Sequence, residues 1–128
     1  MDYQGVIIEE SLDTKDILEE VNILSTKVEP INERHQTPWV SQWTLHTIKV
    51  PEAEAQVLAE NISKVLDPKH EWYADFKNES HHYIIFRNKV FFVDRHSEHE
   101  YQQVREYGIS LGIPEYQVNF SRQVIKSE

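Results

Sequence analysis

The chain has no cysteine among its 128 residues, which excludes disulfide bonds, cysteine-based zinc sites, thiol nucleophiles and dithiol redox motifs. It has three glycines, too few and too scattered for a phosphate-binding loop of the P-loop or dinucleotide type. No stretch approaches the roughly 18 consecutive apolar residues that a membrane-spanning helix needs. The N-terminus lacks the basic and apolar regions of a signal peptide. These absences predict a cytoplasmic protein that does not associate with membranes.

Acidic residues outnumber basic ones, 22 to 13, and the formal net charge is -9. Because affinity for nucleic acids comes mainly from neutralising phosphates, this balance argues against a nucleic-acid partner. The acidic groups gather at the start of the chain, where residues 1–33 hold nine acidic and two basic side chains. Residues 34–49 hold two basic side chains and no acidic one. An anionic or polar ligand is therefore expected to bind away from the N-terminal third.

Hydrophobic alternation predicts strands, and apolar residues at helical spacing predict helices. The expected strands are 5–9, 22–31, 42–50, 72–77, 82–87, 90–94 and a short edge strand at 116–120. The expected helices are 13–20, 51–67 and 98–111. The strands around 83–86 and 90–93 are apolar on both faces, which predicts that both are central and covered on each side.

Local signals fix several ends of these elements. Ser97 and Glu100 match a capping box at the start of the last helix. Gly112 is suited to end that helix in the left-handed conformation. Asn88 predicts a tight turn between two strands, because asparagine tolerates positive φ.

The sequence predicts a single α+β domain over residues 1–120, followed by a frayed tail at 121–128. Its first elements follow the βαββαβ order of ferredoxin-like folds, and the added hairpin and C-terminal helix depart from that order. We therefore expect one mainly antiparallel sheet with two to three helices, as a variant of the ferredoxin-like fold.

The segments at 72–78, 82–91 and 107–114 carry a resemblance to known sequences. In these segments the chain resembles a family of small prokaryotic proteins catalogued as conserved hypotheticals, and the similarity extends along most of the chain. The resemblance implies a prokaryotic, cytoplasmic, stand-alone domain. It implies no activity, ligand or catalytic residue.

Seven histidines raise the question of a metal site. His96 precedes the cap of the last helix, so its ring is not fixed on the same face as that of His99. His81 and His82 are adjacent on a strand and point to opposite faces. We therefore expect no structural metal and no cofactor, and a metal-binding protein is the third of the functional alternatives.

A second group combines aromatic and polar side chains on the Pro38 loop and the neighbouring strands. Half-buried pockets suit such residues, because tyrosine and tryptophan pair an apolar body with a polar tip. The candidate ligand-binding residues are Trp39, Trp43, His46, Tyr73, Asp75, Lys77, His82, Tyr83 and Arg87. The alternative is that they form the edge of a core, with cross-strand pairs such as Asp75 with Arg87.

Two functional hypotheses lead. The first is a non-enzymatic binding or interaction module for a small polar or anionic ligand, able to form a homodimer through an exposed sheet face or edge. The second is a small enzyme in which His46 or His82 pairs with Asp75 for acid–base chemistry on a small polar or anionic substrate. No serine lies in a nucleophile-elbow context, so the sequence names no catalytic nucleophile.

Overall fold

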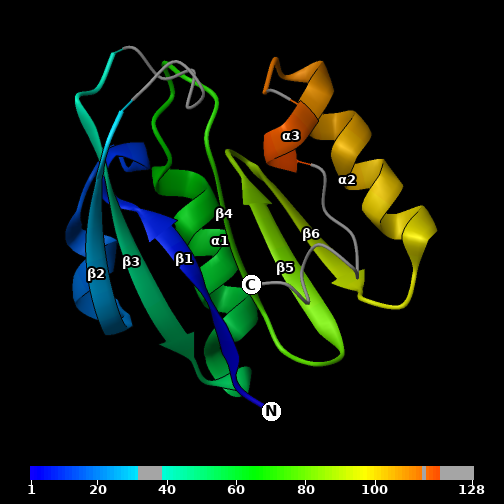
Figure 1. Ribbon diagram of the computed structural model, residues 1–128. Coiled ribbons are helices and arrows are strands. Elements are labelled where there is room, and N and C mark those ends of the chain that lie inside the picture. Colours follow the sequence, from blue (N-terminus) through cyan, green and yellow to red (C-terminus); the bar gives the residue numbers. More distant parts are fainter. Residues whose placement is uncertain (32–38, 114, 119–128) are drawn as a thin grey trace.

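A six-stranded sheet in the order β2-β3-β1-β4-β5-β6 organises the computed structural model, which describes residues 1–31, 39–113 and 115–118 (Figure 1). The strands are β1 (Tyr3–Ile8), β2 (Asn22–Pro30), β3 (Gln42–Val50), β4 (Tyr73–Lys77), β5 (His81–Phe86) and β6 (Lys89–Asp94). The α-helices are α1 (Ala55–Val65), α2 (Glu98–Ser110) and α3 (Glu115–Val118). Short 3-10 helices are η1 (Glu9–Ser11), η2 (Asp16–Glu20) and η4 (Glu52–Glu54). No helix in these described ranges is long and apolar enough to cross a membrane.

All neighbouring strands in the sheet run antiparallel, which confirms the predicted α+β class with one antiparallel sheet. β1 lies between β3 and β4, and α1 connects these two strands in a split β-α-β arrangement. The connection from β1 to β2, where a ferredoxin-like fold has a helix, holds only η1 and η2 among its described elements. The complete ferredoxin-like topology is therefore not shown.

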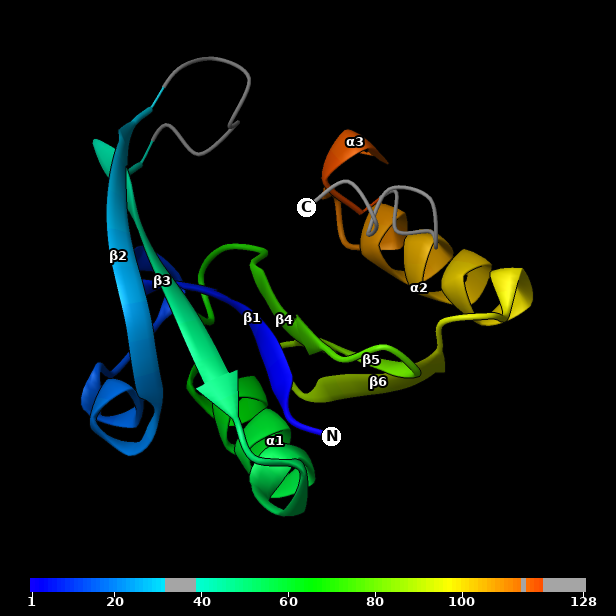
Figure 2. The same cartoon turned by 60° about the horizontal axis from the view of Figure 1, so that its bottom comes forward.

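The two faces of the sheet are covered differently, as Figure 2 shows. α1 packs on one face, over a core that includes Ile7, Ile48, Phe76 and Ile85. α2 and α3 lie on the other face, over β5 and β6, and form a second core around Phe86 and other buried side chains. β5 is buried on both sides, as predicted from its apolar run.

The prediction that residues 90–94 form a central strand is wrong. β6 is the last strand of the sheet, and Phe92 on its α1-facing side is 51% exposed. Each face of β6 is partly covered, which explains the apolar run Val90–Val93. Val93 packs beneath α2 on one face, and Val90 packs against the α1 core on the other. A two-sided apolar pattern therefore did not require a neighbouring strand on each side.

The predicted helix at 13–20 is reduced to η2, because the chain before it is held extended. Leu12 forms an isolated bridge with Leu66, and the backbone N–H of Asp13 donates to the carbonyl of Val65. The predicted edge strand at 116–120 is also wrong, since Glu115–Val118 is helical. Val118 is fully buried against Gly108, so α3 docks on α2 instead of extending the sheet. Residues 119–128, including the predicted tail, lie outside the described residues.

The predicted signals at Ser97, Gly112 and Asn88 are confirmed. The Ser97 side chain accepts a hydrogen bond from the backbone N–H of Glu100 at the start of α2. Gly112 has φ +92° after α2, and Asn88 has φ +59° in the β5–β6 turn. The capping box is not reciprocal, because the Glu100 carboxylate accepts from the backbone of Asp94.

Candidate functional site

The side chains of β1, β3 and β4 that point away from α1 form a partly exposed surface, referred to below as the open face. Its central residues are Gln4, Val6, Thr47, Asp75 and Lys77, each partly or fully exposed. The register places Val6 between Thr47 and Asp75, and Gln4 beside Lys77. Among the described elements, α2 and α3 cover β5 and β6 on this side of the sheet. They leave β1, β3 and β4 uncovered (Figure 2).

A hollow of about 440 Å³ occupies one end of the open face. Gln4, Val6, Thr47 and Lys77 form its floor. The rest of its lining comes from Met1, Asp2, Gly5, Asn78, Glu79 and Arg95. The lining is mixed in charge and rich in hydrogen-bonding groups, so the hollow is suited to a small polar molecule.

A row of hydrogen-bonding groups runs from beneath α2 to the open face. The Nε2 atom of His82 lies 2.6 Å from Oδ2 of Asp75, and its Nδ1 atom lies 3.2 Å from the hydroxyl of Tyr101. His82 and Tyr101 are fully buried, whereas the Asp75 side chain is 17% exposed. With a neutral imidazole, Nε2–H donates to Asp75, and Nδ1 accepts the proton of the Tyr101 hydroxyl. The row therefore holds one carboxylate oxygen in place and ends at the open face.

Burial raises the pKa of Tyr101 to about 12. The nearby Arg95 guanidinium opposes this shift through its charge and by hydrogen bonding, but it does not outweigh desolvation. Tyr101 therefore stays protonated at neutral pH and remains able to donate to His82. The Arg95 guanidinium also donates to the backbone carbonyl of Asn78, which fixes it at the edge of the hollow.

The raised pKa of Tyr101 predicts a loss of stability in alkaline solution. Unfolded tyrosine loses its proton near pH 10, whereas folded Tyr101 keeps it to about pH 12. Between these values the folded state binds more protons, so the free energy of unfolding falls as pH rises, by about 3 kcal/mol for a shift of this size. Tyr101→Phe should be less stable than the wild type at pH 8 and should lose part of that deficit by about pH 11. Urea unfolding of both proteins across this range measures the difference, and a difference independent of pH would contradict the assignment.

The structure brings together four of the candidate residues predicted from the sequence. Tyr73, Asp75 and Lys77 share one face of β4, and His82 lies opposite Lys77 on β5. The hydroxyl of Tyr73 donates to the backbone carbonyl of Gln117, at 2.6 Å, and ties β4 to α3. Of the two predicted acid–base pairs, the structure forms His82 with Asp75.

Two more candidates, Trp39 and Trp43, belong to an aromatic cluster at the other end of the sheet. The ring of Trp43 lies 6.1 Å from that of Trp72, just beyond the last pairing of β1 with β3. Trp39 stacks on His70 with ring centroids 3.8 Å apart. These tryptophans do not line the described hollow.

His46, Tyr83 and Arg87 lie away from the open face. His46 points to the opposite side of β3, where Nε2 contacts Glu9 at 3.0 Å and Nδ1 contacts Thr26 at 2.9 Å. Hydrogen bonding to His46 lowers the pKa of Glu9, although burial opposes the shift. Tyr83 is buried in the α1-facing core. Arg87 is exposed at the β5–β6 turn, at the opposite end of β5 from His82, and it does not pair with Asp75.

Five residues of this site were not predicted from the sequence, namely Gln4, Val6, Thr47, Arg95 and Tyr101. β1 was expected to lie in the acidic third that a ligand avoids, but it runs through the middle of the sheet. Tyr101 lies in the helix predicted at 98–111 and was not among the candidate site residues. A tyrosine on the buried face of a helix, where its hydroxyl needs a partner, was the available signal.

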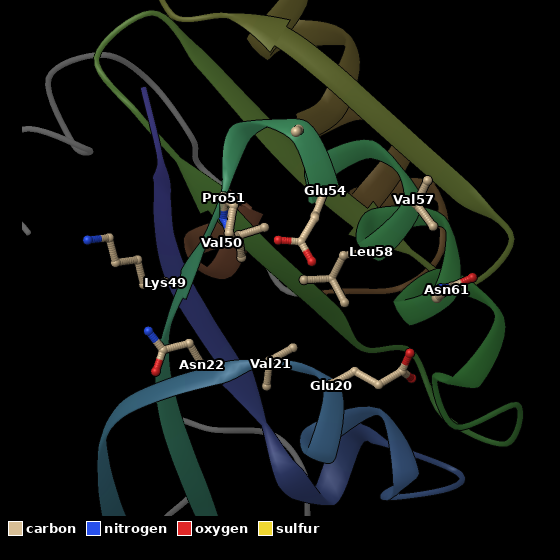
Figure 3. A pocket seen from close by; sticks show the side chains of 11 residues that line it. Glu20, Val21, Asn22, Lys49, Val50, Pro51, Glu54, Val57, Leu58 and Asn61 are labelled. Atoms are coloured by element: carbon tan, nitrogen blue, oxygen red, sulfur yellow. The ribbon is translucent and has the colours of Figure 1, made fainter.

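A second hollow, of about 390 Å³, lies between the end of η2 and α1 (Figure 3). Glu54 and Leu58 project from the helical side toward Val21. Glu20 and Glu54 are both exposed, and no buried polar group is among the lining residues. This hollow offers less to position a ligand than the open face does.

No group of three or more histidine, aspartate or glutamate side chains is arranged to hold a metal ion within the described ranges. No family model matches the chain, and neither a curated protein nor a solved structure shows significant similarity to it.

Proposed function

We propose that the protein is a binding module that holds a small polar ligand on its open face, with Asp75 as the anchor. The observation that carries the proposal is the position of the Asp75 carboxylate. Its Oδ2 atom is held 2.6 Å from the Nε2 atom of a fully buried histidine, while the side chain stays partly exposed. A carboxylate fixed in this way binds a ligand donor without first losing rotamer freedom.

The surrounding groups define the chemistry of the ligand. In the described residues, the second carboxylate oxygen of Asp75 has no hydrogen-bond partner, so it suits an ammonium, amide or hydroxyl donor. Lys77 and Arg95 line the adjacent hollow together with Asp2 and Glu79, and the two cationic side chains offer partners to an acidic group. Asp75 and Lys77 are two residues apart on one strand, roughly 7 Å along it. The ligand class that fits is a small molecule with a donor at one end and an acidic group at the other.

The row of Tyr101, His82 and Asp75 favours a second candidate, an enzyme that uses Asp75 as a general base. The buried imidazole would stabilise the carboxylate and respond to its change in charge during proton transfer. In an enzyme of this kind, Asp75→Asn would abolish turnover and leave substrate binding largely intact. In a binding module, the same substitution acts on affinity.

The proposal predicts that Asp75→Asn weakens ligand binding at least about tenfold, because the charged acceptor is lost while the shape is kept. A thermal-shift screen of free amino acids and small amino-carboxylic acids supplies the probe. A ligand of this class should stabilise the wild type by mass action. Titration calorimetry with the strongest hit then compares the two proteins.

Asp13→Asn is the matched control, since Asp13 is exposed and lies outside the hollow. It should bind like the wild type. Backbone amide shifts on titration should move at Val6, Thr47 and Lys77. Equal affinity in Asp75→Asn and the wild type, or shifts confined to α1, would refute the assignment of the site.

A further inference from the structure

We infer that β2 is a self-pairing edge through which two copies of the chain associate, with Val28 at the centre of the contact. β2 is the outermost strand of the sheet, next to β3 alone. It spans nine residues, most of them exposed, and Val28 is 54% exposed. A long exposed edge with apolar side chains is a template for another strand.

The hydrogen-bond pattern of the β2–β3 pair shows which backbone groups face outward. The N–H of Ile31 donates to Ser41, and these residues continue the register of Pro30 with Gln42. In an antiparallel ladder the residues bonded to the partner alternate. The backbone N–H and C=O groups of Glu29 and Lys27 therefore bond to β3. The backbone groups of the alternate residues, Thr26, Val28 and Pro30, point away from the sheet.

Proline at position 30 fits this assignment. Pro30 has no N–H, and it occupies one of the outward positions, where a proline costs the sheet no internal hydrogen bond. The outward donors are then the N–H groups of Thr26 and Val28, and the matching acceptors are the carbonyls of Val28 and Pro30. Antiparallel pairing of two copies with Val28 opposite Val28 uses both donors of each chain.

The charges of β2 favour a second copy over an unrelated strand. The side chains of Lys27 and Glu29 lie 3.2 Å apart on one face of β2, and the side chain of Val28 between them points to the other face. In the register centred on Val28, each lysine stands opposite the glutamate of the other chain. The same antiparallel register brings the two valines into contact across the symmetry axis. Opposite charges directly across a strand pair stabilise it, and like charges destabilise it.

Sedimentation velocity over about 10 μM to 1 mM protein is the direct test, because an interface of a few residue pairs is expected to be weak. Wild-type protein should shift from monomer to dimer within this range. Lys27→Glu and Glu29→Lys should each weaken association at least about tenfold, since each places like charges opposite one another. An equimolar mixture of the two variants should recover the dimer, because it restores opposite charges in every pair.

Lys64→Glu and Glu60→Lys on α1 are the matched controls, since they make the same charge changes at exposed positions away from β2. Both should associate like the wild type. Thermal unfolding of each variant shows that it is folded before the sedimentation data are compared. A wild type that stays monomeric throughout, a dimer that the β2 variants leave unchanged, or a mixture that fails to associate would each overturn the inference.

Discussion

Ile85→Asp is expected to unfold the domain at room temperature. Ile85 is fully buried on β5, opposite Ala74 of β4 and Val90 of β6, in the core beneath α1. A carboxylate there has no partner, and its burial costs several kcal/mol in addition to the lost apolar contacts. The free energy of unfolding of a domain of this size is about 5–15 kcal/mol, so the substitution is expected to remove most or all of it.

The control is Val57→Asp, which makes the same kind of change on α1 at a residue that is 61% exposed. It should alter the free energy of unfolding by about 1 kcal/mol or less. Circular dichroism and thermal melts compare the three proteins. If Ile85→Asp melted within a few degrees of the wild type, β5 could not be the buried centre of its half of the sheet.

The elements best predicted from the sequence are those determined by local pattern. The strand predicted at 42–50 has these bounds in the structure, because Trp43 to Val50 alternate in burial along a β-branched, aromatic run. Ser97 and Gly112 bound α2 as expected, since caps depend on neighbouring backbone groups only. The burial of residues 83–86 on both faces was likewise predictable, because all four residues are apolar or aromatic.

The partners of these elements were not predictable, because they depend on contacts between distant residues. β1 lies at the centre of the sheet because it pairs with β3, more than 35 positions away in the sequence, and with β4, more than 65 positions away. This pairing puts Gln4 beside Lys77 and Val6 beside Asp75, although the charge pattern had separated the N-terminal third from the site.

Strand register explains why one of the two predicted acid–base pairs formed and the other did not. His82 and Asp75 are on adjacent strands with side chains on the same face, which a β4–β5 hairpin permits. His46 has the opposite parity on β3, so it faces Glu9 on the other side of the sheet. A shift of one residue in β5 would have turned His82 away from Asp75, and sequence spacing alone does not fix that register.

Gly5→Ala is expected to destabilise the protein by about 3 kcal/mol or more, at the upper end of the cost of overpacking. A Cβ atom at Gly5 would overlap the carbonyl oxygen of Asp75 and approach the Cα of Phe76. Both obstacles are backbone atoms, so no side-chain rotation relieves the overlap. β1 and β4 are paired over three residue positions only, from Gln4 to Val6, and this short ladder joins the two halves of the sheet.

The same substitution should disturb the open face, because the strand segment that must move carries Asp75. Gln4→Ala is the control: Gln4 is the exposed neighbour of Gly5, and its replacement adds no atom between the strands. Urea unfolding should show a large loss for Gly5→Ala and a small one for Gln4→Ala. Amide chemical shifts should change at Asp75 and His82 in Gly5→Ala, since the backbone of β4 is displaced under the 2.6 Å contact between these side chains. Native stability in Gly5→Ala would mean that β1 and β4 can separate without cost, and the carboxylate would then lack the rigid support that the proposed binding site requires.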